Sequence, residues 1–149
     1  MTNFLLIALL YVVLVAAGKP MQGNVSSELN KLRGTWLLVE EIDDGKQMPA
    51  EEAKKNKLTF DGEGRWKVEI DGKIVGEGTA KIDPSRKPRT IDYTFTKGDG
   101  NGAKFMAIYE LDGDSYRHCG VLRGTRPSEF SSTPGSGQIL TVFRREKRD

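Results

Sequence analysis

Leu32-Arg33-Gly34-Thr35-Trp36 begins the part of this chain that decides its fold. Just before it, Ser26 can cap a short helical turn that places Leu29 and Leu32 on one side. After it, the helical period disappears, and apolar and polar residues alternate with the period of two that is typical of β-strands. The stretch therefore predicts the start of the first strand of an all-β domain.

Eight segments follow this alternation, and each ends at turn residues. They are residues 34–42, 57–60, 65–70, 73–82, 90–96, 104–111, 115–122 and 138–145. Asp61-Gly62-Glu63-Gly64, Asp71-Gly72 and Asp112-Gly113-Asp114 predict tight hairpins, because Asp-Gly pairs favour short antiparallel turns. No segment has the length and period of a crossover helix, so a parallel sheet is not expected. We predict an eight-stranded antiparallel up-and-down barrel, whose closure leaves no edge strand exposed.

The connections between these segments differ in length. Residues 43–56, 97–103 and 123–137 form long loops, and in an up-and-down barrel all three lie at the same end. The barrel is therefore expected to be a cup with one decorated rim, just wide enough to be filled by side chains or to hold one small ligand. Gly76 and Gly78 share one face of their segment, with Ala80. These small residues either leave room inside or let the wall bend inward.

The first residues of the chain resemble a leader. Residues 4–17 are apolar and uncharged, which suits the core of a signal peptide and is shorter than the roughly 18 residues that a spanning helix needs. The chain is expected to divide into a signal peptide or uncleaved anchor (1–17), a linker with a short helix (18–31), the barrel (32–145) and a charged tail (146–149). We expect an exported protein, periplasmic or extracellular, without a stable membrane span after cleavage.

Composition gives little support to any particular partner. The chain has 23 Lys and Arg against 21 Asp and Glu, a net charge of +2. Such mixed charge keeps a surface soluble, and nucleic-acid binding is not expected. The single cysteine, Cys119, cannot form an intrachain disulfide and is either buried or available for intermolecular pairing. We expect a monomer.

Several motifs resemble one family. Gly34-Thr35-Trp36 with Arg144 resembles the floor signature of lipocalins and other calycins, in which the arginine packs over the tryptophan. Over nearly all of residues 32–145, the chain is similar to exported bacterial lipocalin-like domains of unknown function. The matching segments are Leu32-x-Gly34-Thr35-Trp36, Asp83-Pro84 with Pro88 and Ile91-Asp92, Ile108-Tyr109-Glu110-Leu111-x-Gly113-Asp114, Cys119, Arg126-Pro127-x-Glu129-Phe130 and Leu140-x-Val142-x-Arg144. The resemblance implies a lipocalin-like fold and carries over no established activity.

The alternation gives this floor a physical interpretation. Counting by twos places Trp36 and Glu40 on one face of the first strand, and Arg144 on the matching face of the last. These two strands meet when the barrel closes, so the Arg144 guanidinium can stack on the indole. We expect Gly34, Trp36 and Arg144 to form a structural floor rather than a ligand site.

Candidate catalytic residues are few. His118, the only histidine, directly precedes Cys119, and neighbours on a strand point to opposite faces, so the two cannot form a nucleophile–base pair. One histidine and one cysteine also fall short of a zinc site unless carboxylates join them. His118 is expected to be a barrel or surface residue. We expect no metal, no cofactor and no enzymatic activity.

The sequence is compatible with three hypotheses for function. The leading one is a carrier or sensor of a small, partly apolar molecule, which the fold favours by analogy. The interior would be lined by Trp66, Tyr93, Phe95, Tyr109 and Tyr116, with Glu40 as an inward polar group. The alternative is a protein-interaction or inhibitor module that uses the open-end loops, residues 46–56 and 123–137. An enzyme that uses a carboxylate or a tyrosine inside the barrel ranks last.

The loop that contains Arg126-Pro127-Ser128-Glu129-Phe130 has two interpretations. In the first, Arg126 and Glu129 tie the long connection down and Phe130 fills a gap in the rim. In the second, the loop is a lid or a contact edge over the cup. We favour the structural role, because a loop of this length needs anchoring.

Overall fold

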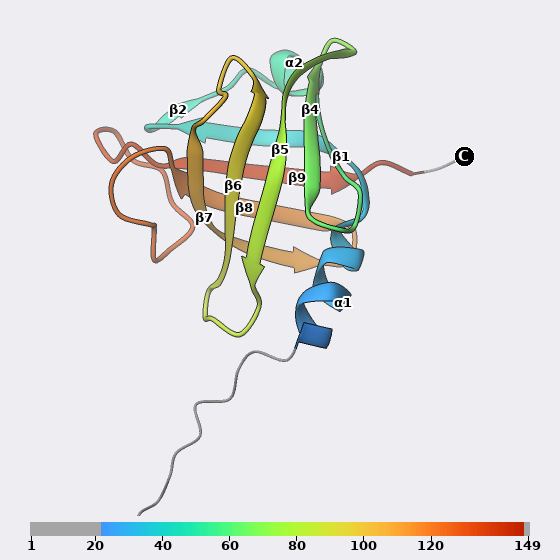
Figure 1. The fold of residues 1–149 in the computed structure, drawn as a ribbon. Coiled ribbons are helices and arrows are strands. Elements are labelled where there is room, and N and C mark those ends of the chain that lie inside the picture. Colours follow the sequence, from blue (N-terminus) through green and yellow to red (C-terminus); the bar gives the residue numbers. More distant parts are fainter. Residues whose placement is uncertain (1–21, 148–149) are drawn as a thin grey trace, which may run out of the picture.

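The computed structural model describes residues 22–147, and its strands close into a barrel (Figure 1). Eight antiparallel strands form the wall. They are β1 (Gly34–Asp43), β3 (Asn56–Phe60), β4 (Arg65–Ile70), β5 (Lys73–Asp83), β6 (Arg89–Gly98), β7 (Lys104–Asp112), β8 (Ser115–Val121) and β9 (Ile139–Arg145). The first strand, β1, pairs with the last, β9, which closes the barrel. The predicted eight-stranded, lipocalin-like antiparallel barrel is confirmed, and every strand lies within two residues of its predicted bounds.

The predicted leader, residues 1–17, lies outside the described residues, as do residues 18–21 of the predicted linker and the last two residues of the tail. In the described part of the chain, no helix combines the length and the apolar character that spanning a membrane requires.

The N-terminal helix is longer than the sequence predicts. Helix α1 spans Gln22–Leu32, so Ser26 lies inside it instead of capping it. The side chain of Leu32 is fully buried, and Val25 and Leu29 pack against the same core. These three residues follow helical spacing along one face, and packing of such a face stabilises a helix that its local sequence supports only weakly. Tertiary contact with the barrel therefore explains the extra length.

Two short elements that were not predicted lie in the first long loop. Strand β2 (Lys46–Gln47) pairs with the end of β1 and adds a short ninth strand beside the barrel. Helix α2 (Ala50–Ala53) follows it, with Ala53 buried in the core. The loop is thus partly ordered by its own hydrogen bonds and by one small apolar anchor.

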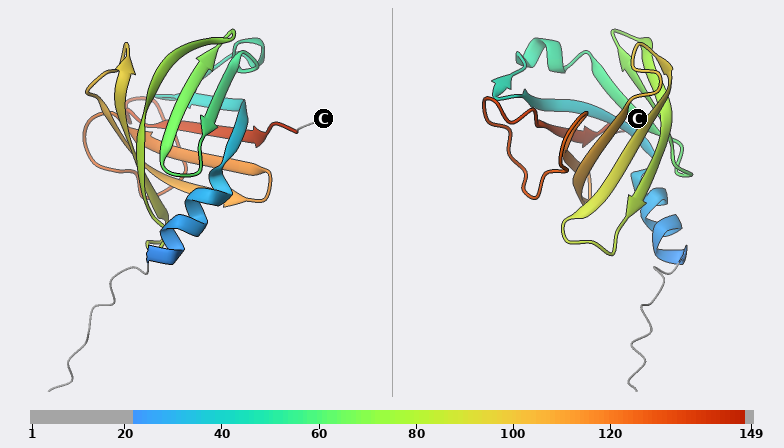
Figure 2. Two further views of the ribbon diagram at one scale, coloured as in Figure 1. Left: turned by 45° about the vertical axis from the view of Figure 1, so that its right-hand side comes forward. Right: turned by 60° about the vertical axis from the view of Figure 1, so that its left-hand side comes forward.

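The connections divide between the two ends of the barrel as the alternation predicts. Helix α1 lies against the end where β1 begins and β9 finishes (Figure 2). The long loops lie at the opposite end, together with the tight turn between β4 and β5. In that turn Asp71 and Gly72 both have positive φ, 51° and 75°, which suits a two-residue hairpin turn. One end is closed by a helix and the other is surrounded by loops.

The small residues of β5 make room for an indole. Trp66 of β4 lies against Gly78, and its ring meets Phe95 edge-on with 4.8 Å between ring centroids. The register of β5 with β6 shifts between Glu77 and Gly78, where β6 carries an extra residue. Of the two interpretations of these small residues, the structure therefore supports room inside the barrel, and a large aromatic side chain takes part of that room.

Gly78→Ala is expected to lower the free energy of unfolding by about 1–3 kcal/mol or more, the loss typical when extra atoms are inserted into a well-packed core. A Cβ at this position would lie 1.8 Å from the Thr94 carbonyl oxygen and 2.8 Å from the Trp66 ring, and the backbone cannot yield as a side chain can. Gly76→Ala is the matched control, because its Cβ would meet the Phe95 ring at 3.5 Å and the Trp66 ring at 3.9 Å, both ordinary contact distances. We expect that control to be neutral or slightly stabilising in urea denaturation. Equal midpoints for the two variants would contradict the predicted clash.

The long loop between β8 and β9 is anchored to the outer wall of the barrel. The Arg126 guanidinium donates to the Ala107 carbonyl oxygen at 2.8 Å and pairs with Asp92 at 2.6 Å. The Arg117 guanidinium lies over the Phe130 ring, 4.0 Å from its centroid. These partners belong to β6, β7 and β8, so the loop is tied to the wall by a basic and an aromatic side chain.

Other details of this loop differ from the sequence interpretation. Glu129 forms no ion pair among residues 22–147, whereas Pro127 is buried. Cys119 is fully buried and its thiol donates to the Ser131 carbonyl oxygen at 3.2 Å. Burial raises the pKa of the Cys119 thiol, which lowers its reactivity at neutral pH. Of the two alternatives for this cysteine, the structure supports burial.

Candidate functional site

The closed end of the barrel is built around Trp36. Its side chain is fully buried, and the indole N–H donates to the Leu32 carbonyl oxygen at 2.8 Å. That oxygen belongs to the last turn of α1, where carbonyl groups have no partner within the helix. The tryptophan thus joins the first strand to the helix that covers this end.

Arg145, and not the predicted Arg144, lies over the Trp36 ring, with its guanidinium carbon 4.1 Å from the ring centroid. Trp36 and Arg145 are direct partners across β1 and β9, and direct partners in an antiparallel pair point to the same side. Arg144 pairs with Leu37 and is exposed. The Arg145 guanidinium also donates to the carbonyl oxygens of Lys31 and Arg33, at 2.8 and 2.7 Å. One arginine therefore covers the indole and caps the end of α1.

Arg145→Ala is expected to lower the free energy of unfolding by about 2 kcal/mol, because it removes the stacked cation, its two hydrogen bonds to carbonyl oxygens and its hydrogen bond to the exposed Asp114 carboxylate. Arg144→Ala should change it by about 0.5 kcal/mol or less, as exposed substitutions do. The two variants remove the same charge from adjacent positions, so net charge cancels in the comparison. Thermal unfolding of both at one pH is the measurement, and a larger loss for Arg144→Ala would contradict the assignment.

A buried carboxylate holds the middle of α1 to the barrel. Glu28 is only 5% exposed and forms ion pairs with Arg89 and Lys31. It also accepts a hydrogen bond from the Tyr109 hydroxyl at 3.2 Å, while Arg89 lies over the Tyr109 ring. Tyr109 is fully buried by these contacts. It serves the closed end and does not line the cavity described next.

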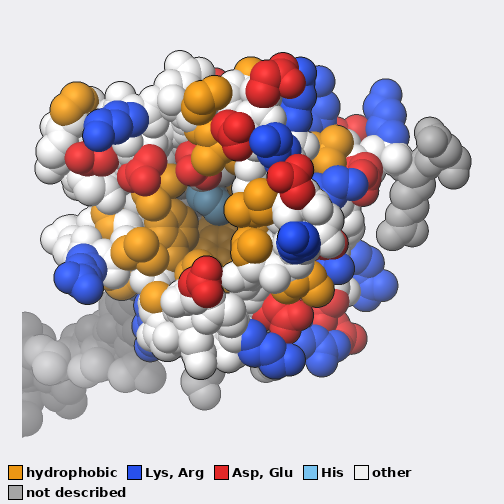
Figure 3. All heavy atoms as spheres, turned by 90° about the horizontal axis from the view of Figure 1, so that it is seen from above, with side chains coloured by type: hydrophobic (Ala, Val, Ile, Leu, Met, Phe, Trp, Pro, Cys, Tyr) orange, Lys and Arg blue, Asp and Glu red, His pale blue; other side chains and the backbone are white. Residues whose placement is uncertain are grey.

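Above this closed end, the barrel contains a cavity of about 230 Å³ that opens among the long loops. Viewed from that end, the molecule is hollowed, with orange side chains around the hollow and the pale blue of the single histidine inside it (Figure 3). The lining is mainly apolar and aromatic. It consists of Leu38, Glu41, Asn56, Lys57, Leu58, Trp66, Val68, Tyr93, Phe95, Phe105, His118, Leu122, Ile139, Thr141 and Phe143.

Three of the six residues predicted to face a ligand line this cavity: Trp66, Tyr93 and Phe95. Tyr109 and Tyr116 are fully buried but do not line it. Tyr116 packs deeper, with its ring 5.6 Å from that of Trp36 between centroids. Aromatic residues of the barrel thus divide into a wall around the cavity and a layer beneath it.

Glu40, the sixth predicted residue, does not line the cavity, and Glu41 takes that place. A bulge in β1 between Leu38 and Glu40 shifts the pairing with β9 by one residue. A bulge adds one residue to a strand and reverses the alternation beyond it. Val39 is consequently 47% exposed, and Glu41 is the partner of Thr141 on the inner wall.

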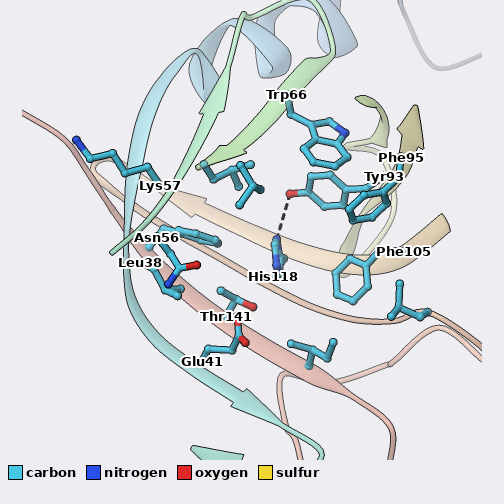
Figure 4. Close-up of a pocket in the computed structure, with 15 residues that line it drawn as sticks. Leu38, Glu41, Asn56, Lys57, Trp66, Tyr93, Phe95, Phe105, His118 and Thr141 are labelled. Atoms are coloured by element: carbon cyan, nitrogen blue, oxygen red, sulfur yellow. Dashed lines mark hydrogen bonds between the residues drawn. The ribbon is translucent and has the colours of Figure 1, made fainter. Parts of the chain in front are cut away.

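The polar part of the cavity is a row across three neighbouring strands, continued by Asn56 and Lys57 on β3, the other neighbour of β1. Glu41 of β1 pairs with Thr141 of β9, and Thr141 pairs with His118 of β8. All three line the cavity (Figure 4). Burial raises the pKa of Glu41, and the nearby Asp43 carboxylate raises it further. The opposite wall carries Trp66 and other aromatic or aliphatic side chains, so the cavity has one polar side and one apolar side.

His118 forms a buried hydrogen-bonded cluster with two tyrosines. The Tyr93 hydroxyl lies 2.5 Å from the Tyr116 hydroxyl and 3.1 Å from His118 Nδ1, and the Tyr116 hydroxyl lies 3.4 Å from the same nitrogen. Burial lowers the pKa of His118 to about 3, so the imidazole is neutral at physiological pH. Burial likewise raises the pKa of both tyrosines, which stay protonated.

The sequence interpretation did not select His118, Thr141, Phe105 or Phe143 as cavity residues. For His118 a signal was present, because counting by twos from Tyr116 along β8 places both on one face. For β9 the sequence was ambiguous, because Leu140 and Val142 on the outer face are as apolar as the residues on the inner one. Alternation alone could not choose between these faces.

Other candidate chemistry is limited. Among residues 22–147, no group of three or more His, Cys, Asp or Glu side chains could hold a metal ion. His118 and Cys119 point to opposite sides of β8, since one lines the cavity and the other bonds to the outer loop. The arrangement that remains is an apolar cup with a neutral imidazole, a hydroxyl and a carboxyl on one wall.

Comparison of the chain with protein families, with curated proteins and with solved structures finds no match.

Proposed function

We propose that the protein binds a small, partly apolar molecule inside its barrel. The observation that carries the proposal is the open cavity of about 230 Å³, with aromatic walls and a polar row formed by Glu41, Thr141 and His118. Concave apolar sites with a few placed polar groups are the usual form of small-molecule sites. The volume is slightly below the common range, which favours a compact ligand.

The closed end supports this proposal. The barrel is stabilised at the end away from the cavity. The contacts there are the stacking of Arg145 on Trp36, the packing of α1 over them and the buried Glu28 carboxylate. A cavity usually lowers stability, because its lining atoms lose contacts. A separate, well-packed floor allows a barrel to keep an opening at its other end.

We propose that the chain belongs with exported lipocalin-like domains, on the strength of its motifs and its barrel. We propose export to the periplasm or the extracellular space, with the apolar residues 4–17 as the leader. We propose that it acts as a monomer. We propose binding rather than catalysis, because a neutral histidine whose pKa is about 3 is a weak base at neutral pH.

Binding can be tested through Trp66, which lines the cavity. Titration with small uncharged aromatic probes is expected to change its fluorescence in a saturable way. Val68→Phe adds a ring to the cavity wall and should abolish the change, whereas Lys67→Phe adds the same ring to the adjacent position, which does not line the cavity, and should preserve it. Native mass spectrometry of protein from its own host tests for a retained molecule. Absence of both a retained molecule and saturable binding would contradict the proposal.

A second candidate function is contact with a protein partner at the open end. It is favoured by exposed apolar residues there, since Ile74 and Leu122 are each 52% exposed and Ile70 is 39% exposed. The predicted contact loops are 46–56 and 123–137, and the second is anchored to the outer wall by Arg126. Exchange of residues 46–55 and 123–137, which keeps the cavity residue Asn56, should abolish partner capture while leaving probe binding at Trp66 intact.

A further inference from the structure

We propose that the two buried tyrosines fix His118 as a hydrogen-bond donor through Nε2, and that the cavity therefore selects uncharged ligands with a hydrogen-bond acceptor, such as a carbonyl or ether oxygen. This inference rests on the proposed binding function and names the chemical class of the ligand.

The tautomer follows from a count of protons in the buried cluster. Tyr93 and Tyr116 bring two hydroxyl protons, and the acceptors within reach are the two hydroxyl oxygens and His118 Nδ1. If Nδ1 carries no proton, Tyr93 donates to it and Tyr116 donates to the Tyr93 oxygen, so both hydroxyl protons are used. If Nδ1 carries a proton, three protons share two oxygens, and one buried hydroxyl has no acceptor in the cluster. An unmade buried hydrogen bond costs about 1–3 kcal/mol. If Nδ1 is unprotonated, the remaining proton is on Nε2, at the open cavity, where solvent or a ligand can accept it, whereas the stranded hydroxyl of the other tautomer is buried. The neutral ring therefore carries its proton on Nε2.

This Nε2–H group is available to a ligand. The imidazole lines the cavity, and its other nitrogen bonds to both tyrosines; Figure 4 shows the bond to Tyr93. Among residues 22–147, no side chain or carbonyl group accepts a hydrogen bond from Nε2. A buried donor without a protein partner gains most from an acceptor that a ligand brings with it.

The charges around the cavity favour a neutral acceptor over an anionic one. Lys57 is the only basic residue in the lining, and its ammonium bonds to Glu146 at 2.7 Å and points away from the cavity (Figure 4). The Glu41 carboxyl group lies in the wall, and His118 contributes no charge. A ligand carboxylate would be buried without a cation, which is costly. A carbonyl or ether oxygen can accept from Nε2 without this cost.

The volume sets the size of the ligand. About 230 Å³ corresponds to roughly eight water molecules at their volume in the liquid. A single substituted ring fits this space, and the edge-on rings of Trp66 and Phe95 offer it an aromatic wall.

Three probes of equal heavy-atom count test the proposal: acetophenone, 2-phenylpropene, which replaces the carbonyl by an isosteric methylene, and benzoate. Their affinities for the full protein can be measured through Trp66 fluorescence. Acetophenone is expected to bind more tightly than benzoate. The ratio of acetophenone to 2-phenylpropene affinity should fall about fivefold in His118→Phe, the loss expected for one net hydrogen bond. Tyr116→Phe is the matched control and should keep the ratio, because Tyr93 alone still donates to Nδ1.

Nitrogen-15 NMR of the wild-type protein provides a test that needs no variant, since the chain has one histidine. Protonated Nε2 and unprotonated Nδ1 are expected, with a shift of the Nε2 signal when acetophenone binds. A protonated Nδ1, or probe binding with an unchanged affinity ratio in His118→Phe, would overturn the inference while leaving the binding function in place. If none of the probes binds at the cavity, this inference fails, and the binding function fails with it when native mass spectrometry also finds no retained molecule.

Discussion

Trp36→Ala is expected to lower the free energy of unfolding by about 3–5 kcal/mol, the range measured when large aromatic side chains are removed from cores. Native domains are stable by about 5–15 kcal/mol in total, so the variant should be partly unfolded or melt at a much lower temperature. Three contacts are lost together: the buried ring, its hydrogen bond to Leu32 and the surface on which Arg145 stacks. Removal of the indole also leaves the Leu32 carbonyl oxygen without the N–H group that donates to it.

Urea denaturation followed by circular dichroism measures this loss. Val39→Ala is a suitable control, because Val39 lies on the same strand and is 47% exposed. That substitution should change stability by no more than about 0.5 kcal/mol. A Trp36→Ala protein that unfolds at the wild-type urea concentration would show that the indole does not hold the floor together.

The strands were predictable because their pattern is local. Charged and apolar residues alternate without interruption in Arg65–Ile70, and the adjoining Asp71-Gly72 turn takes the positive φ angles that its sequence favours. Loop lengths also placed the open end correctly. The extension of α1 was not predictable in this way, because it depends on the docking of Val25 onto a barrel formed by distant residues.

Side-chain direction within a strand was harder to predict than the strand itself. Because β1 contains one bulged residue, the carboxyl group that points inward is that of Glu41 and not that of Glu40. On β9 the inward face ends at Arg145 and the outward face at Arg144. Because the two arginines are adjacent, a motif that requires an arginine near the end of the last strand matches either of them. A one-residue shift moves a whole set of side chains to the other face of a sheet. Such shifts are decided by cross-strand partners, which the linear pattern does not contain.

The hydrogen-bond partner of His118 could not be predicted from its own strand. Its position on β8 is compatible with the inner face, but nothing near it in sequence indicates that Tyr93, 25 residues away, supplies its hydrogen bond. β6 and β8 both pair with β7, and closure of the curved sheet into a barrel turns their inner side chains toward one another. The same closure removes the imidazole from water and changes its protonation, which leads to a measurable consequence for stability.

The stability of the fold is expected to depend on pH through His118. Burial lowers its pKa to about 3, against about 6.5 in the unfolded chain. Between these values the unfolded state binds a proton that the folded state does not, so unfolding is favoured as the pH falls. The contribution is complete above pH 6.5 and decreases by about 1.4 kcal/mol for each pH unit below it.

His118→Gln isolates this effect, because glutamine can accept a hydrogen bond from Tyr93 and does not titrate. Carboxyl groups also titrate in this range, and Glu41, whose pKa is raised, acts in the opposite direction by favouring the folded state at lower pH. These groups are common to both proteins and cancel in the difference. Urea denaturation from pH 7 to pH 4.5 should therefore give a steeper loss of stability for the wild type than for His118→Gln. If stability falls equally with pH in the two proteins, the imidazole gains its proton in the folded protein without leaving the cluster. The assignment of His118 as a buried, neutral histidine would then be wrong.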